Sequence, residues 1–231
     1  MINIVRKQKA PECLEIEKQK EISGKKEGKY DCGEVKSILK REFLNKCYIC
    51  ETSKITDLQI EHFEPHQKKN IELKFDWNNL FFSCSYCNGK KSNNYNTDNY
   101  NRILDCTKVE QDVENWIIYR KTITLKSKFD ISVNEKLVEK DFLKETQNTV
   151  NLLNNIYNGN QKTKEKTENL NDKIYGELKY FQNAIEKYFS EIETDKNLKR
   201  IKFKLSRKSD YVSFKRWIVK ENYPEFIQYF D

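Results

Sequence analysis

Four cysteines in the first half of the chain form two C-x-x-C pairs, Cys47/Cys50 and Cys84/Cys87. A gap of two residues lets both sulfurs of a pair reach one tetrahedral ion, and two such pairs complete a shell of four thiolates. The 33 residues between the pairs exceed the usual zinc-ribbon spacing, so another structure is folded into the interval. Because four thiolates leave no open coordination position, the pattern predicts a structural zinc site. The alternative is four buried free cysteines.

The interval contains an acid–histidine pair, Glu61-His62, which ends the short apolar run 58–60. Pro65 follows and forces the chain out of a strand. A neutral imidazole with a pKa near 6.5 is suited to act as a general base at neutral pH. A single histidine in such a place is nevertheless a structural residue more often than a catalytic one. The chain has one other histidine, His66, which we interpret as an exposed loop residue.

The surrounding pattern predicts the elements that position these residues. Residues 33–43 carry apolar side chains at helical spacing, and the chain between residues 47 and 95 fits two brief strands followed by a helix. A further strand is expected at 116–119, with residues 123–125 as its hairpin partner. Beyond residue 130 the chain is expected to be helical, with two core-facing stripes. Their members are Thr146, Val150, Leu153 and Tyr157, and then Leu170, Ile174, Leu178, Phe181, Ile185, Phe189 and Ile192.

These expectations define an α+β protein with three regions. Residues 1–32 form an N-terminal arm, residues 33–100 form the ββα core with the zinc site, and residues 101–231 form a mostly helical accessory region. No apolar run reaches the length of about 18 residues that a membrane span needs, and the first residues lack the apolar core of a signal peptide. The sequence therefore predicts a soluble, cytoplasmic protein without a membrane partner.

The cytoplasmic expectation also bears on the remaining cysteines. The cytosol keeps thiols reduced, so the seven cysteines are not expected to form disulfides. Cys13, Cys32 and Cys106 have no partner at metal-binding spacing, and we interpret them as ordinary small apolar residues.

The net charge of +7 favours a polyanionic partner, although a lysine-rich composition gives the same value. The segment 196–220 holds ten Lys or Arg residues and one acid, interleaved with four aromatic residues, Phe203, Tyr211, Phe214 and Trp217. Such a segment can follow a nucleic-acid backbone while its aromatic rings stack on bases. The alternative is a solvated basic helix whose aromatic rings face the core.

The parts together resemble the zinc-braced HNH endonucleases. The shared pattern is C-x-x-C, a strand ending in acid-His-x-x-Pro, and then W-N-N-L-x-x-x-C-x-x-C-N-x-x-K. The segment before the first cysteine pair, residues 145–154 and residues 209–217 also resemble the PtuB-type HNH proteins of bacterial anti-phage Septu and retron systems. The resemblance implies a ββα-metal HNH nuclease core within residues 33–100.

The resemblance also implies roles for individual residues. His62 matches the general base, and Glu61 and Asn88 match the ligands of a catalytic divalent cation. One carboxylate and one amide oxygen make a hard, incomplete shell suited to Mg²⁺ or Mn²⁺, whereas the thiolates suit zinc. Asn79 matches the asparagine that fixes the loop and the imidazole, with Asn78 as the competing choice. Lys91 matches a basic position that faces the phosphate.

The function implied is a metal-dependent endonuclease, the effector of an anti-phage complex, acting on DNA or alternatively on tRNA or other RNA. The chain has no G-x-x-x-x-G-K-[ST] loop, so nucleotide control would come from another protein. Proteins of this type act beside an ABC-like ATPase (PtuA type), which we expect to dock on the region after residue 130. The alternatives are a non-catalytic zinc module that recruits nucleic acid, in which Glu61 and His62 pair with each other, and an ATPase-docking subunit.

Overall fold

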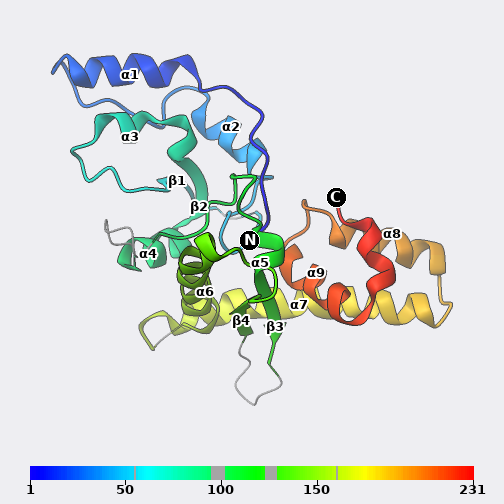
Figure 1. Cartoon of the computed structure of the whole chain (residues 1–231). Helices are drawn as coiled ribbons and strands as arrows, with labels where there is room; N and C mark the ends of the chain where they lie inside the picture. The colour runs from blue at the N-terminus through cyan, green and yellow to red at the C-terminus, as the bar shows by residue number, and fades with distance from the viewer. Residues whose placement is uncertain (55, 95–101, 123–128, 160) are drawn as a thin grey trace.

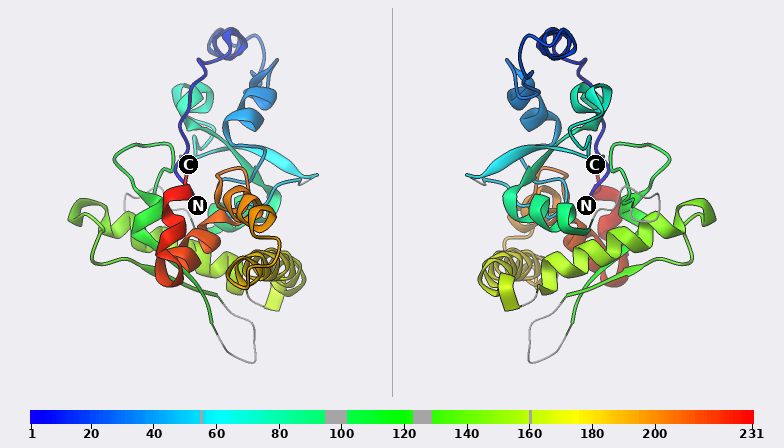
Figure 2. Two further views of the ribbon diagram at one scale, coloured as in Figure 1. Left: turned by 90° about the vertical axis from the view of Figure 1, so that its right-hand side faces the viewer. Right: turned by 90° about the vertical axis from the view of Figure 1, so that its left-hand side faces the viewer.

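The computed structural model of the chain is shown in Figure 1. It describes residues 1–54, 56–94, 102–122, 129–159 and 161–231. Helices α1 and α3 lie at one end of the molecule and the long helix α7 lies at the other, as Figure 1 and Figure 2 show. Its described residues also form two small antiparallel sheets. Within the described ranges, no helix has both the length and the apolar character needed to cross a membrane.

The N-terminal region contains helices α1 (Glu12–Ile22) and α2 (Val35–Glu42). Helix α2 buries Val35, Ile38 and Leu39, as the helical spacing predicted. A disulfide joins Cys13 of α1 to Cys32, so two expectations are wrong: that the cysteines form no disulfide, and that these two are ordinary apolar residues. Gly33, next to Cys32, favours this pairing in two ways. Its left-handed φ of +48° turns the chain, and its lack of a side chain avoids a Cβ that would lie 3.1 Å from the Cys13 sulfur.

The predicted arrangement of two strands and a helix is confirmed. Strand β1 (Leu58–His62) pairs antiparallel with β2 (Leu80–Cys84), and the register places His62 opposite Leu80. The connection between the strands contains α3 (Ile71–Phe75) and the short 3-10 helix η1 (Trp77–Asn79). Helix α4 (Ser85–Asn94) begins directly after β2. Every residue of β2 is buried, so this strand anchors the unit in the core.

The second sheet pairs β3 (Ile117–Lys121) with β4 (Phe129–Val133). Residues 123–125, which we predicted as the partner strand, lie outside the described residues. Helix α5 (Val113–Trp116) precedes this sheet, and η3 (Lys140–Phe142) and α6 (Leu143–Asn158) follow it. The Asn154 amide bonds both backbone groups of Ile131, at 2.7 and 3.3 Å. Asn158 does the same for Phe129, so α6 satisfies the free edge of β4.

The C-terminal region is helical, as predicted. It contains η4 (Gln161–Thr163), α7 (Lys164–Phe189), α8 (Thr194–Leu205), α9 (Val212–Asn222) and η5 (Pro224–Tyr229). The predicted stripe of α6 is buried, and so is the stripe of α7 as far as Ile185. The prediction is wrong for the last two residues of the second stripe. Helix α7 ends at Phe189, and Phe189 and Ile192 are each about half exposed.

The three regions share one core. The main hydrophobic cluster contains Phe81 of the ββα unit together with Trp116 and Phe214 from the accessory region. Polar contacts cross the same boundary, including a hydrogen bond of 3.0 Å between the hydroxyls of Thr52 and Tyr211. These contacts join the ββα unit to the accessory region.

Candidate active site and metal site

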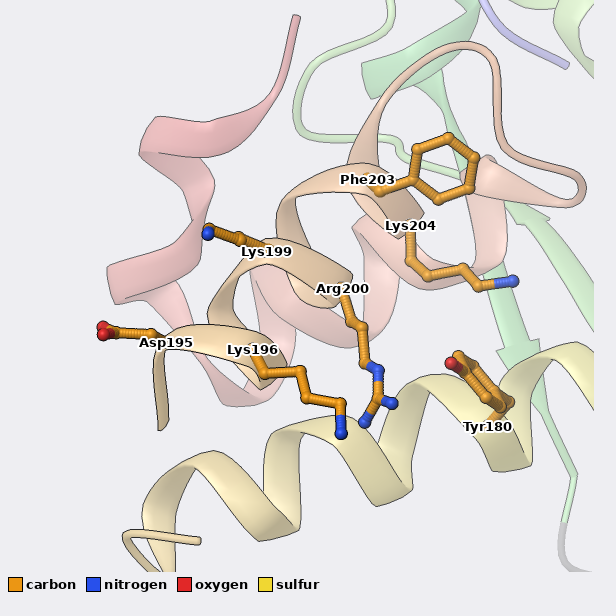
Figure 3. A pocket seen from close by; sticks show the side chains of 7 residues that line it. All are labelled: Tyr180, Asp195, Lys196, Lys199, Arg200, Phe203 and Lys204. Carbon is orange, nitrogen blue, oxygen red and sulfur yellow. The ribbon is translucent and has the colours of Figure 1, made fainter. Parts of the chain in front are cut away.

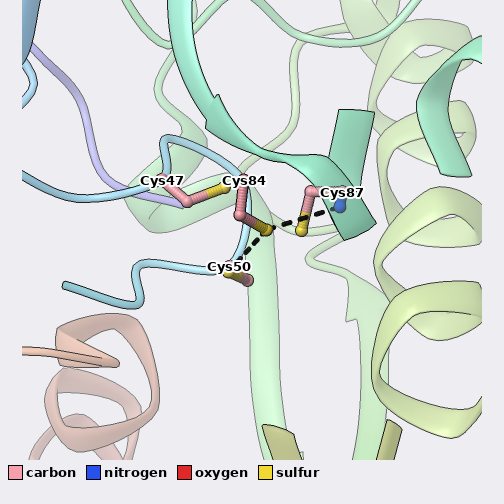
Figure 4. Close-up of side chains that lie close together, drawn as sticks. All are labelled: Cys47, Cys50, Cys84 and Cys87. Carbon is pink, nitrogen blue, oxygen red and sulfur yellow. Dashed lines mark hydrogen bonds between the residues drawn. The ribbon is translucent and has the colours of Figure 1, made fainter. Parts of the chain in front are cut away.

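The four cysteines converge in the interior (Figure 4). Their sulfurs all lie within 4.8 Å of one another, and the Cys50 and Cys84 sulfurs are 4.0 Å apart. Four sulfurs placed 2.3 Å from a tetrahedral ion would be about 3.8 Å apart, so the arrangement fits an ion of the size of zinc. Burial raises the pKa of the Cys47 and Cys87 thiols, because a buried thiolate lacks solvation. A bound cation would offset that cost.

Local backbone contacts shape this cluster. The Cys87 backbone N–H donates to the Cys84 sulfur (3.4 Å), and the Cys47 carbonyl accepts from the N–H of Glu51 (2.9 Å), which closes each pair into a tight turn. Tyr48 donates its backbone N–H to the Phe82 carbonyl of β2 (3.1 Å), so the first pair is fastened beside the second. Cys106 is also buried but stands apart from the cluster, in agreement with its prediction as a small apolar residue.

His62 lies at the end of β1, and its ring is held in a defined protonation state. The Nε2 atom is 3.0 Å from the carbonyl oxygen of Lys74. A carbonyl can only accept, so Nε2 carries the proton and Nδ1 keeps the lone pair. Burial lowers the pKa of His62 to about 4. The imidazole is therefore neutral at neutral pH, as a general base must be before it takes a proton.

The Glu61 side chain lies beside α4, where it meets Lys91. Lys91 donates from Nζ to the Glu61 carboxylate (Oε2, 3.0 Å) and to the His62 carbonyl (2.9 Å). Both side chains are almost fully buried. This arrangement differs from the expectation that Lys91 faces the phosphate. The reason is helical spacing, because Lys91 lies four residues after Cys87 and shares its buried face of α4. Glu61 bonds Lys91, and no hydrogen bond between Glu61 and His62 is present among the described residues.

Asn88 follows the second cysteine pair on the more exposed side of α4. Its amide donates to the Gln59 side chain (3.1 Å), and its amide oxygen accepts from Ser92 (3.4 Å). Asn88, Glu61, His62 and Lys91 all line one pocket of about 440 Å³, together with the segment 65–68. The structure therefore brings four predicted site residues to one place, which we call the His62 pocket.

The oxygen donors of this pocket are chemically suited to a hard cation. The second Glu61 oxygen, Oε1, is buried without a hydrogen-bond partner among the described residues. It is one candidate ligand, and the Asn88 amide oxygen is the other. Lys91 bonds Oε2 and the buried Tyr48 hydroxyl lies beside the same carboxylate, so Oε1 is the oxygen that Glu61 would offer to a divalent cation.

Asn79 fastens the loop that supports His62. Its Nδ2 donates to the carbonyls of Glu64 (2.9 Å) and Leu73 (3.0 Å), and its Oδ1 accepts from the Glu64 backbone N–H (2.7 Å). The Leu73 carbonyl directly precedes the Lys74 carbonyl that bonds His62. Asn79 thus positions the His62 imidazole indirectly, through the backbone of residues 73 and 74. The competing residue, Asn78, is exposed, and its backbone N–H donates to Asp76 (2.9 Å).

His66 is a pocket residue that the sequence did not reveal. We expected an exposed loop residue, but its ring is only partly exposed and stands 4.5 Å from the His62 ring, centroid to centroid. Tyr30 packs at the same distance on the His62 ring. Only residues 63–65 separate the two histidines, and the chain turns directly after His66 at Gln67 and Lys68, both with left-handed φ. The one available signal was Pro65, which indicates a turn but not its direction.

Comparison with known proteins gives the class of this site. Residues 47–94 match the HNH endonuclease family, and they hold both cysteine pairs, β1, β2 and α4. This part of the chain is an HNH endonuclease domain.

A second comparison narrows the type. The chain is similar to Septu protein PtuB of Bacillus mycoides (strain KBAB4), with 39% identity over 75 residues. The match covers 26% of this chain and 25% of that protein, so it spans about a quarter of the relative's length. No solved structure matches the chain. Together the two matches support an HNH nuclease of the PtuB type.

Proposed function

We propose that this chain is a metal-dependent HNH endonuclease that hydrolyses phosphodiester bonds, with DNA as its substrate. The observation that carries the proposal is the His62 imidazole. It is neutral, its Nδ1 lone pair is free of the Lys74 carbonyl, and it lines the same pocket as Glu61 and Asn88. A proton acceptor and two hard oxygen donors in one pocket are what hydrolysis of a phosphodiester requires.

The proposed chemistry assigns each side chain a task. His62 accepts a proton at Nδ1 from the attacking water, and the Nε2–H bond to the Lys74 carbonyl stabilises the imidazolium that forms. Lys91 orients the Glu61 carboxylate through Oε2. A Mg²⁺ or Mn²⁺ ion held by Glu61 and Asn88 would neutralise charge on the phosphate and on the leaving oxygen. The four-cysteine shell would hold a structural zinc ion that fixes α4 against β2.

The test uses the full chain with plasmid DNA and, in parallel, total tRNA. We expect cleavage with Mn²⁺ or Mg²⁺ and none after chelation. Zinc per chain is measured in the same samples, so that loss of the catalytic cation is distinguished from loss of the structural one. His62→Ala should lower the cleavage rate by about 10²- to 10⁴-fold, the usual cost of losing a general base, while zinc content stays constant.

Gln67→Ala is the matched control, because Gln67 is an exposed, uncharged residue that lines the same pocket. If His62→Ala cuts within threefold of the wild type, His62 is not the base. If the wild-type chain binds nucleic acid but cuts neither substrate, the chain is a non-catalytic zinc module. Cleavage of tRNA alone would assign the activity to RNA.

We further propose that the chain works as the nuclease effector of an anti-phage complex beside an ABC-like ATPase of the PtuA type. The similarity to a Septu protein supports this role. The exposed apolar side chains Phe189 and Ile192, at the end of α7, support docking on the helical region. Replacing both with Asp should abolish co-purification with the ATPase, whereas Val109→Asp, at another exposed apolar position, should not. Equal yields from all three proteins would contradict this docking site.

A further inference from the structure

The basic C-terminal segment divides into a buried half and an exposed half. In α9, Phe214 and Trp217 belong to the main hydrophobic cluster, together with Tyr211 just before the helix. These three rings therefore face the core, as in the second of the two alternatives that the sequence left open, and do not stack on bases. Two cations of α9 are also buried: Lys215 pairs with Glu177 (3.4 Å) and Arg216 pairs with Glu114 (2.6 Å).

Helix α8 places its charged side chains outward. It buries Ile201 and Leu205 against the second hydrophobic cluster. Along its other side lie four cations, Lys196, Lys199, Arg200 and Lys204, and the ring of Phe203. These residues and Tyr180 of α7 line an open cleft, which we call the α7–α8 cleft. In Figure 3 the side chains of Lys196, Arg200 and Lys204 extend over α7, where Tyr180 stands.

Two exposed aromatic rings distinguish this cleft from an ordinary solvated basic helix. Phe203 is 59% exposed and Tyr180 is 48% exposed. Burial normally stabilises an aromatic ring, and a ring that is exposed among charged groups lacks this stabilisation. Exposed apolar side chains of this kind are common on binding surfaces. Lys204 already lies over the Tyr180 ring, with its Nζ 4.9 Å from the ring centroid.

The charges in the cleft favour an anion. Asp195 is its one acidic lining residue, against four cations. Lys204 bonds Glu177 (2.7 Å) and Lys196 bonds Glu193 (2.7 Å), whereas Arg200 donates to the neutral Asn197 (3.0 Å), so the positive charge of Arg200 is not compensated by that contact. Arginine also stacks on planar groups, including bases.

We propose that the α7–α8 cleft binds an unpaired strand of nucleic acid. Lys199 and Arg200 contact phosphates, and Phe203 and Tyr180 stack on bases. Stacking on these rings requires bases that are not paired, so the cleft favours a single strand over a duplex. This inference rests on the proposed action on nucleic acid, because it assigns a second contact for the substrate outside the HNH domain. Strand binding, however, is measurable without cleavage.

The test measures fluorescence anisotropy of a labelled single-stranded oligonucleotide, in a His62→Ala background and without added Mg²⁺ or Mn²⁺. Lys199→Gln with Arg200→Gln should weaken binding and flatten the slope of log affinity against log salt by about 1.4, at about 0.7 per phosphate contact. Phe203→Ala should weaken binding by about 5- to 100-fold and leave that slope unchanged, since stacking releases no counterions. Both changes should weaken binding of a duplex less than they weaken binding of the single strand.

Lys136→Gln with Lys140→Gln is the matched control, because it removes the same charge at exposed positions outside α8. Melting temperatures of all variants confirm that the fold is retained. The proposal is overturned if the cleft variants bind the strand as the control does. It is also overturned if they keep strand affinity but lose the ATPase, which would assign the cleft to an acidic protein surface. If the wild type cuts nothing while the cleft variants lose strand binding, the proposed nuclease fails and the cleft stands.

Discussion

Replacing Asn79 with alanine tests how the HNH domain supports its histidine. Asn79 is 4% exposed, and its amide makes three hydrogen bonds that close the loop after β1 onto α3. The substitution removes all three and leaves backbone groups of Glu64 and Leu73 without their partner. A neutral hydrogen bond contributes about 1 kcal/mol net, and a buried group left unpaired costs about 1–3 kcal/mol. Because water can reach part of this loop, we expect a loss of about 2–4 kcal/mol in the free energy of unfolding.

The same substitution should also slow cleavage. When the Leu73 carbonyl is released, the adjacent Lys74 carbonyl no longer holds the His62 ring in one orientation. A displacement of about 1 Å of a catalytic group can cost about 10²-fold, so we expect at least a tenfold lower rate at a temperature where the variant is folded. Urea unfolding measures the first effect and plasmid cleavage the second. Asn78→Ala is the control, because Asn78 is exposed, and it should change stability by less than about 0.5 kcal/mol. The reasoning is refuted if Asn79→Ala costs less than 1 kcal/mol, or if Asn78→Ala costs as much.

Two further predictions concern the metal site and the C-terminal core. Cys84→Ser should lose bound metal, melt at a lower temperature and be inactive, because metal binding at such a site is coupled to folding; Cys106→Ser, also at a buried cysteine, should keep one metal ion per chain. A Cys84→Ser protein with full zinc content and unchanged melting would contradict the four-cysteine site. Burial lowers the pKa of Lys215 from 10.5 to about 8. Between these two pH values the unfolded chain therefore binds more protons than the folded chain. The contribution of Lys215 to the free energy of unfolding then rises with pH, by at most about 1.4 kcal/mol per pH unit. Urea midpoints of the wild type should therefore rise relative to those of Lys215→Met across this range, and parallel curves would show that the lysine does not titrate there.

The parts of the fold that the sequence predicted are those that short-range spacing determines. A two-residue gap fixes how two cysteines of a pair approach one ion, and short apolar runs mark β1 and β2 within a few positions. Asn79 was preferred over Asn78 on its place in the pattern, and the structure gives Asn79 the buried bonds. The burial of Lys91 was also contained in the sequence, in its separation of four residues from Cys87, but we assigned that lysine from its match to a basic position of the family pattern.

The features that the sequence did not predict depend on contacts between distant segments. Nothing in the spacing of Cys13 and Cys32 indicates that a left-handed glycine turns one toward the other. His66 contacts His62 in a loop with no periodic pattern, which turns directly after it at the left-handed residues Gln67 and Lys68. Tyr180 and Phe203 come from different helices, and only the packing of α7 on α8 makes them neighbours in one cleft.

The cysteines of this protein require opposite redox conditions during purification. A reductant such as a small dithiol protects the four clustered thiols from oxidation, but it also opens the Cys13–Cys32 bond. Air or a mild oxidant preserves that bond, yet four sulfurs within 4.8 Å of one another would then cross-link if no ion held them. A chelator added to suppress nucleases would remove the ion and so favour cross-linking of the four clustered sulfurs. Zinc in the buffer, with neither reductant nor chelator, is the condition under which both sets of sulfurs keep their state.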